Sequence, residues 1–151
     1  MQNVFMMEKE EYLKAEELLA GYGGLIEEID WLKSNIEDLE DEFEGCTSIE
    51  ITTGGATNKF NSIVENEVIA KEDKLKTLNF KLYENLRLKK KIDRAVEKLK
   101  GVDREVIELR YINKRVLGWK EIAYTVRYSE TYCRKKIKQR AIKKMAKYIV
   151  Y

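Results

Sequence analysis

The sequence predicts an all-α protein: an N-terminal helical hairpin and a long helix, followed by a C-terminal three-helix module with a helix-turn-helix. Three observations support this fold class. Proline is absent from all 151 residues, and 37% of the residues are charged. Apolar residues also recur at three- and four-residue spacing over most of the chain. Helices can run uninterrupted in such a chain, because no proline ring clashes with a preceding turn.

The first 44 residues predict two helices. One is expected from about residue 8 to residue 20, ended by glycines that disfavour a helix interior by about 1 kcal/mol each. The second is expected over residues 25–44, with Trp31 beside its seam and packed against the first helix. The apolar side of the first helix is Tyr12, Ala15, Leu18, Leu19 and Tyr22; the glycines are Gly21, Gly23 and Gly24; the coiled-coil-like seam of the second is Leu25, Ile29, Leu32, Ile36, Leu39 and Phe43.

A loop is expected over about residues 45–61, which are rich in Thr, Ser, Asn and Gly, with a short extended piece at Ile49–Ile51. A long helix is then expected from Ser62 to Leu99. Its heptad register is kept by Leu75, Leu78, Leu82, Ile92, Val96 and Leu99, with Asn85 and Lys89 as polar interruptions. An intramolecular antiparallel pair and a homodimer through the long helices both fit this pattern. The expected domains are residues 1–100 and residues 101–151.

Charge is divided along the chain. Residues 1–70 hold 17 acidic and 4 basic residues, a balance of −13, whereas residues 71–102 balance to +6 and residues 103–151 to +9, which gives the net +2. An acidic front joined to a basic back is expected when one end meets nucleic acid. There is no histidine, and the only cysteines are Cys46 and Cys133. We therefore expect no metal, no cofactor and no enzymatic activity. No apolar run reaches the length of a membrane span, so a cytoplasmic protein with no membrane contact is expected.

The last third predicts three helices, over about residues 104–112, 119–126 and 130–148. Asp103 is expected to cap the first of them and Ser129 the third. The small Ala123 and the tight connection Arg127-Tyr128-Ser129 are typical of a helix-turn-helix. With Cys133, Ile137, Ala141 and Met145 turned inward, a helical wheel places Thr131, Lys135, Lys138 and Gln139 outward and Arg134 on the flank.

Residues 103–145 resemble the region-four helix-turn-helix of bacterial sigma factors. The resemblance is carried by Arg104 to Tyr111 (REVIELRY), Trp119 to Ala123 (WKEIA), the Ser129 cap and the inward Cys133, Ile137 and Ala141. The layout of the rest resembles phage-encoded, sigma-like regulators of the ArpU/RinA type. This implies transcriptional control of phage or prophage genes in a bacterial host, with double-stranded DNA and RNA polymerase as partners. Gly118, Tyr132 and Cys133 depart from the sigma pattern, so the base preference cannot be carried over.

The resemblance implies roles for particular side chains. The expected base-reading residues are Glu130, Thr131, Arg134 and Lys135, and the expected DNA-backbone contacts are Lys114, Arg115, Lys120, Arg127 and Lys138. The competing hypothesis is a phage assembly protein such as a small terminase-type subunit. Those proteins tend to place the DNA-binding module before the oligomerising helices, which is the reverse of the order here.

Overall fold

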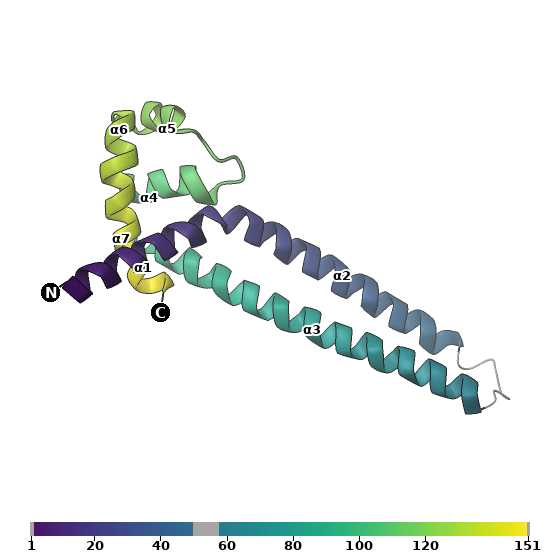
Figure 1. Ribbon diagram of the computed structural model, residues 1–151. Coiled ribbons are helices and arrows are strands. Elements are labelled where there is room, and N and C mark those ends of the chain that lie inside the picture. Colours follow the sequence, from purple (N-terminus) through teal and green to yellow (C-terminus); the bar gives the residue numbers. More distant parts are fainter. Residues whose placement is uncertain (1, 50–57, 151) are drawn as a thin grey trace. The chain divides into compact units, whose positions relative to one another are not determined.

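The computed structural model describes residues 2–49 and 58–150, and the side chains of residues 6–43 and 64–150. The predicted all-α fold class is confirmed: the described residues form helices and no strand (Figure 1). In chain order these are α1 (Gln2–Ala20), α2 (Tyr22–Ile49), α3 (Asn58–Glu97), α4 (Val102–Ile107), a π-helical turn Glu108–Ile112, α5 (Trp119–Val126), α6 (Glu130–Tyr132), a second π-helical turn Cys133–Ile137, and α7 (Lys138–Ile149). None of these helices is both long and apolar enough to cross a membrane.

The break between α1 and α2 covers fewer residues than the sequence predicts. Only Gly21 interrupts the helices, and the backbone N–H of Leu25 still donates to the Gly21 carbonyl at 2.9 Å. Gly23 and Gly24 lie inside α2, so the expected stop at these residues is wrong. Helix propensity is a weak preference, and the apolar seam that begins at Leu25 outweighs it.

The predicted loop over residues 45–61 is wrong at both ends. α2 continues to Ile49 and α3 already begins at Asn58, so Ile49 is helical rather than extended. Residues 50 and 51 of the expected extended piece lie outside the described residues. Thr, Ser and Asn lower helix propensity by only a few tenths of a kcal/mol each, roughly, which does not stop a helix already under way.

The chain packs as two compact units. Residues 1–26 and 87–151 form one, here called the head, and residues 27–86 form the other, here called the hairpin. These contact units divide the chain elsewhere than at the domain boundary expected between residues 100 and 101. The difference arises because α1 and the end of α3 bury apolar side chains against α7.

The head is built around α7. Ile142, Met145 and Ile149 of α7 are buried against Leu19 of α1 and Ile92 of α3. The full buried set is Ala15, Leu19, Tyr22, Ile92, Ala95, Val96, Leu99, Ile107, Ala141, Ile142, Met145, Ala146 and Ile149. The hydroxyl of Tyr22 also donates to Asp93 Oδ1 at 2.7 Å. The last turns of the C-terminal helix therefore depend on helices from the opposite end of the chain.

In the hairpin, α2 and α3 run antiparallel and share the seam predicted from the sequence. Leu32, Ile36 and Leu39 of α2 are buried with Leu78 of α3. Trp31 does not pack against the first helix as expected, because its side chain lies 60% exposed on α2. Asn85, a polar interruption of the seam, has a buried Nδ2 without a hydrogen-bond partner among the described residues.

Candidate nucleic-acid interface

The third core cluster lies at the C-terminal helix-turn-helix. Here α6, the π-helical turn Cys133–Ile137 and α7 are together called the last helix. Ile122 of α5 and Cys133 and Ile137 of the last helix are buried with Val106 of α4. Partly buried Val102, Leu109, Leu117, Trp119, Ala123 and Val126 complete the cluster. Burial raises the pKa of the Cys133 thiol, which behaves as a small apolar side chain here. The inward set inferred from the spacing of these residues is thus confirmed.

A sharp corner joins α5 to the last helix (Figure 1). Arg127 adopts a left-handed backbone (φ 63°, ψ 37°), and its N–H donates to the Ala123 carbonyl at 2.9 Å. Ser129 then begins the next helix, because its Oγ accepts from the backbone N–H of Tyr132 at 3.1 Å. These two contacts end one helix and cap the next within three residues.

The N-terminal turns of the last helix carry the predicted base-reading residues Glu130, Thr131, Arg134 and Lys135, here called the reading face, and expose most of them. Thr131, Arg134 and Lys135 are exposed, while Glu130 is half-buried. None of the three exposed side chains has an ion-pair partner in the part of the chain that the structure describes. Two long cations and a hydroxyl therefore project from one short helical segment that is anchored from behind by Cys133 and Ile137.

Four of the five predicted backbone contacts are exposed on α5 or beside it. Lys114 and Arg115 lie in the connection before α5, Lys120 lies in its first turn and Arg127 lies at its end, and all four are exposed. The connection is held in place by Arg110, whose Nη1 donates to the Leu117 carbonyl at 3.1 Å and whose guanidinium lies 4.9 Å from the Trp119 ring centre. The cations are thus carried by a fixed loop and helix.

The outward position expected for Lys138 is wrong. Its Nζ lies 2.6 Å from Glu16 Oε1 of α1 and 6.0 Å from the Trp119 ring centre, and its side chain is only 19% exposed. Burial by itself lowers the pKa of Lys138, but the hydrogen bond to Glu16 and nearby Tyr111 outweigh it, so the pKa is raised. Lys138 joins α1 to the helix-turn-helix and is not free for a phosphate.

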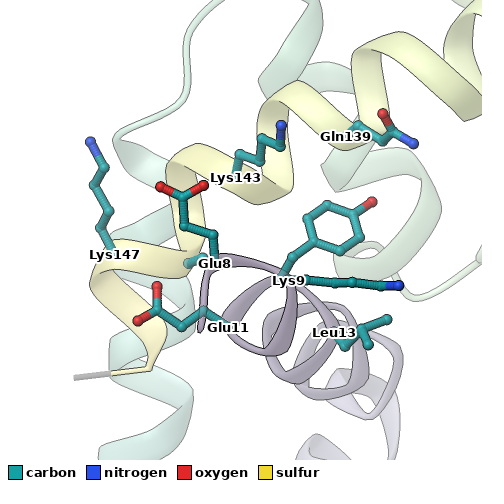
Figure 2. A pocket seen from close by; sticks show the side chains of 9 residues that line it. Glu8, Lys9, Glu11, Leu13, Gln139, Lys143 and Lys147 are labelled. Atoms are coloured by element: carbon teal, nitrogen blue, oxygen red, sulfur yellow. The ribbon is translucent and has the colours of Figure 1, made fainter. Parts of the chain in front are cut away.

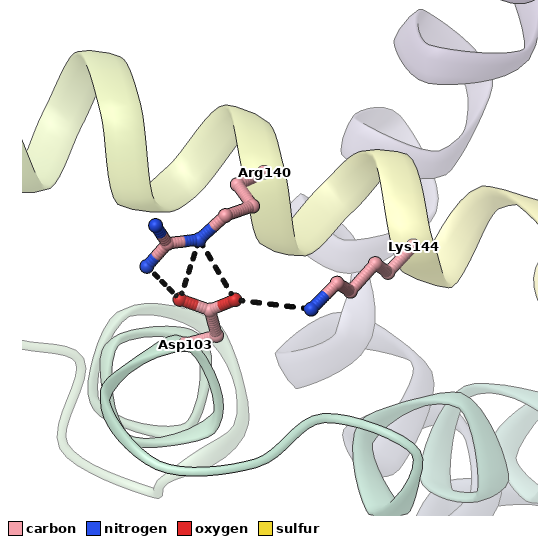
Figure 3. Close-up of polar contacts among 3 residues, drawn as sticks. All are labelled: Asp103, Arg140 and Lys144. Atoms are coloured by element: carbon pink, nitrogen blue, oxygen red, sulfur yellow. Dashed lines mark hydrogen bonds and ion pairs between the residues drawn. The ribbon is translucent and has the colours of Figure 1, made fainter.

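Asp103 does not cap α4 as expected. The helix begins at Val102 after Gly101, whose φ of 62° favours glycine, and Asp103 is buried within the first turn. Arg140 Nε lies 3.0 Å from each Asp103 carboxylate oxygen, Arg140 Nη2 lies 2.5 Å from Oδ1, and Lys144 Nζ lies 3.8 Å from Oδ2 (Figure 3). This ion cluster ties α4 to α7 behind the reading face.

Sequence reasoning missed an aromatic group beside the reading face. Tyr128 and Tyr132 stack with ring centres 5.3 Å apart, and Tyr124 is 88% exposed. The four-residue spacing of these tyrosines is the signal that could have found them. Their rings flank the corner between α5 and α6, where stacking or hydroxyl contacts with a nucleic-acid backbone are available.

A separate groove in the head lies between α1 and α7, around Tyr12, Leu13 and Ala146. Figure 2 shows that Glu8, Lys9 and Glu11 of α1 and Gln139, Lys143 and Lys147 of α7 line it. Its rim mixes both signs of charge, in contrast to the cationic segment at the start of the last helix.

A protein family described as "Protein of unknown function (DUF722)" matches residues 14–147 of the chain. No curated protein and no solved structure matches the chain. The family match begins within α1 and ends within α7, so it covers the helical hairpin as well as the C-terminal module.

Proposed function

The chain belongs to the DUF722 family, and we propose that it is a sequence-specific, double-stranded DNA-binding transcriptional regulator rather than an enzyme. The reader is the C-terminal, sigma region-four-like helix-turn-helix. The single observation that carries the proposal is the exposed, unpaired set Thr131, Arg134 and Lys135 at the start of a helix fixed by a sharp turn. A helix presented in this way fits the major groove of B-form DNA.

In the proposed complex some cationic side chains contact bases and others contact phosphates. Arg134 and Lys135 donate to guanine N7 and O6, and Thr131 reads a base edge or a thymine methyl group. Lys114, Arg115, Lys120 and Arg127 contact phosphates, which position the protein without reading sequence. Glu130 is half-buried at the same helix start and accepts from cytosine N4. Lys138 has no place in this scheme, because Glu16 engages it.

The wider role follows the sequence resemblance to phage-encoded sigma-like regulators of the ArpU/RinA type. The proposed setting is the cytoplasm of a bacterial host, with RNA polymerase as a partner at promoters of phage or prophage genes. The acidic outer face of α2, which includes Glu37, Asp38 and Asp41, is the surface offered for a contact with polymerase.

The test begins with selection of a preferred duplex from a randomised library by the purified full chain. Arg134→Ala or Lys135→Ala is expected to cost about 1–3 kcal/mol on that duplex and to relax its sequence preference. The matched control is Lys147→Ala, an exposed cation near the other end of the same helical rod, which is expected to leave both properties unchanged.

Salt dependence separates positioning from reading. Lys120→Ala is expected to weaken all duplexes to a similar degree and to lower the slope of log affinity against log salt by about 0.9. A selection that yields no preferred duplex, together with a ring-sized oligomer, would reject the regulator and support the assembly-protein hypothesis instead.

A further inference from the structure

Three tyrosines lie at the corner between α5 and the last helix, at four-residue spacing. Tyr124 lies on α5, Tyr128 in the turn and Tyr132 on α6. The rings of Tyr128 and Tyr132 stack, with 5.3 Å between their centres and 25° between their planes. Tyr124 is 88% exposed and Tyr128 is 48% exposed. The corner therefore presents aromatic rings to solvent, and the stack holds one of them in place.

Two of these rings border an open hollow of about 660 Å³. Its lining consists of Ala123, Tyr124, Thr125, Arg127 and Tyr128. Small-ligand sites have volumes of roughly 300–1,000 Å³, so this hollow is of a suitable size. Two aromatic rings and one guanidinium group on the same hollow suit a ligand that is flat, apolar on its faces and attached to an anion.

The charges at the hollow favour an anion. Among the described residues, the only charged side chain that lines it is that of Arg127, whose left-handed backbone donates to the Ala123 carbonyl at 2.9 Å. Lys120 lies one turn before Tyr124 on α5 and is exposed, as Arg127 is. Neither cation forms an ion pair within the part of the chain that the structure describes. The groove between α1 and α7, by contrast, carries both signs of charge.

We propose that the hollow binds one unpaired nucleotide of a DNA strand. The base stacks on the rings of Tyr124 and Tyr128, and the phosphate contacts the guanidinium group of Arg127. This site depends on the proposed DNA binding and extends it, because the hollow adjoins the reading face. Only Ser129, the cap of the last helix, separates Tyr128 from the first residue of that face. The ligand of the module is then a duplex with an unpaired nucleotide at or beside the contacted site.

The aromatic rings favour an unpaired base over a fully paired duplex. In a paired duplex the faces of each base are covered by its neighbours, and proteins reach only the base edges and the backbone. An unpaired base offers its flat face to a tyrosine ring. Such stacking strengthens binding about tenfold and depends little on the identity of the base, because every base has an aromatic face. We therefore expect the hollow to accept any of the four bases.

Continuity with the reading face favours a nucleotide over a protein ligand. Lys120 and Arg127 contact phosphates in the proposed complex, and Arg127 also lines the hollow. A protein that filled the hollow would need a carboxylate beside Arg127, and it would lie where the DNA strand is proposed to run. A nucleotide satisfies the rings and the cation with one ligand.

The first test compares two short duplexes of the same sequence by fluorescence anisotropy with the purified full chain. One is fully paired, and the other carries a single unpaired adenine, moved step by step through the site and its flanks. The sequence is the preferred duplex of the selection, or a random sequence if the selection yields none. In at least one position the unpaired adenine is expected to strengthen binding by the wild type about tenfold.

Variants then test whether the rings cause this gain. Tyr124→Ala is expected to abolish it, so that both duplexes bind equally, and to keep the helix content because the side chain is 88% exposed. Tyr124→Phe keeps the ring and is expected to keep the gain. The matched control is Tyr148→Ala on α7, where the tyrosine is 48% exposed, as Tyr128 is. This control is expected to keep the gain as well.

A third measurement detects the contact directly. With iodouracil as the unpaired base, irradiation is expected to crosslink the DNA to Tyr124 or Tyr128, and mass spectrometry of the peptides identifies the residue.

Three results would overturn the proposal: equal binding of both duplexes by the wild type at every position, a gain that persists in Tyr124→Ala, or crosslinks only to residues outside the hollow. A wild type without the gain, whose Tyr124→Ala variant loses binding to purified RNA polymerase, would assign the hollow to a protein instead. The two proposals fail separately. Absence of the gain leaves a preferred duplex intact, whereas absence of a preferred duplex still allows the gain to be measured on a random sequence.

Discussion

The head and the hairpin are stabilised in different ways, although both are helical and each contains part of α2 and part of α3. In the head, α7 is enclosed by helices from several directions, and Ile142 and Met145 are fully buried. In the hairpin, two helices share one seam, and Phe80, Tyr83 and Trp31 remain mostly exposed. The C-terminal module therefore depends on the N-terminal helix for its core, whereas each helix of the hairpin is buried on one side and leaves large aromatic side chains exposed.

The largest expected effect breaks the core of the head. Ile142→Ala is expected to destabilise the protein by about 2–5 kcal/mol, because a cavity forms where the surrounding helices cannot collapse. Ile36→Ala in the hairpin seam should cost an amount near the lower end of that range, because water and neighbouring side chains reach a two-helix seam. Chemical denaturation with amide hydrogen exchange would locate each loss. Equal costs would contradict the contrast between the two units.

The same contrast predicts the fate of a fragment. Residues 101–151 alone would expose Ala141, Ile142, Met145, Ala146 and Ile149 to water. We expect this fragment to lose its fold by circular dichroism, whereas a cooperatively folded fragment would show that α1 and α3 are dispensable.

A smaller effect is expected at the ion cluster behind the reading face. Asp103→Asn should cost about 1–3 kcal/mol, because the buried position keeps its shape but loses a charge-assisted hydrogen-bond set to Arg140. The matched control is Glu108→Gln, which removes an exposed ion pair with Arg104 at 2.7 Å. That change is expected to cost about 0.3–0.5 kcal/mol in thermal unfolding. A larger loss for the control would remove the special role of Asp103.

The hairpin can be made more stable at its polar interruption. Asn85→Leu is expected to stabilise the seam by about 1–2 kcal/mol, because the buried Nδ2 no longer lacks a hydrogen-bond partner. Asn79→Leu on an exposed position of the same helix serves as the control and should leave stability nearly unchanged. Destabilisation by Asn85→Leu would show that this amide is satisfied in solution.

The smallest expected effect is a pH dependence in the head. Burial, followed by the hydrogen bond to Asp93, raises the pKa of Tyr22 above its ordinary value. Folding therefore favours the protonated hydroxyl; the stability this adds is complete below about pH 10 and is lost as pH rises through the folded pKa. Between pH 10 and pH 11 the Tyr22→Phe variant should therefore lose about 1 kcal/mol less of its free energy of unfolding than the wild type does. Identical alkaline unfolding curves would contradict it.

Much of the fold could be predicted because its elements follow local rules. The range Trp119–Val126 for α5 agrees with the prediction, since an apolar stripe, Gly118 before it and a tight turn after it all favour the same boundaries. The seam from Ile29 to Leu39 is also confirmed, because its heptad spacing leaves one side for a partner helix.

The remaining differences arise from long-range contacts. Nothing near Asp103 in the sequence indicates that its carboxylate would bind Arg140, which lies 37 residues away. Likewise, Glu16 and Lys138 are brought together only by the packing of α1 on the last helix. For the candidate site, the exposure of Thr131, Arg134 and Lys135 agrees with the wheel, but the base-reading roles remain predictions.

The π-helical turn at Cys133–Ile137 sets the rotational phase between the two ends of the last helix. In this turn the hydrogen bonds join residues five apart, so it holds one residue more than an α-helical turn would. Removing a single residue there would turn Thr131 by about 100° relative to Arg140 and its carboxylate anchor. The direction in which Thr131 points is therefore set by the anchored part of the helix around Arg140.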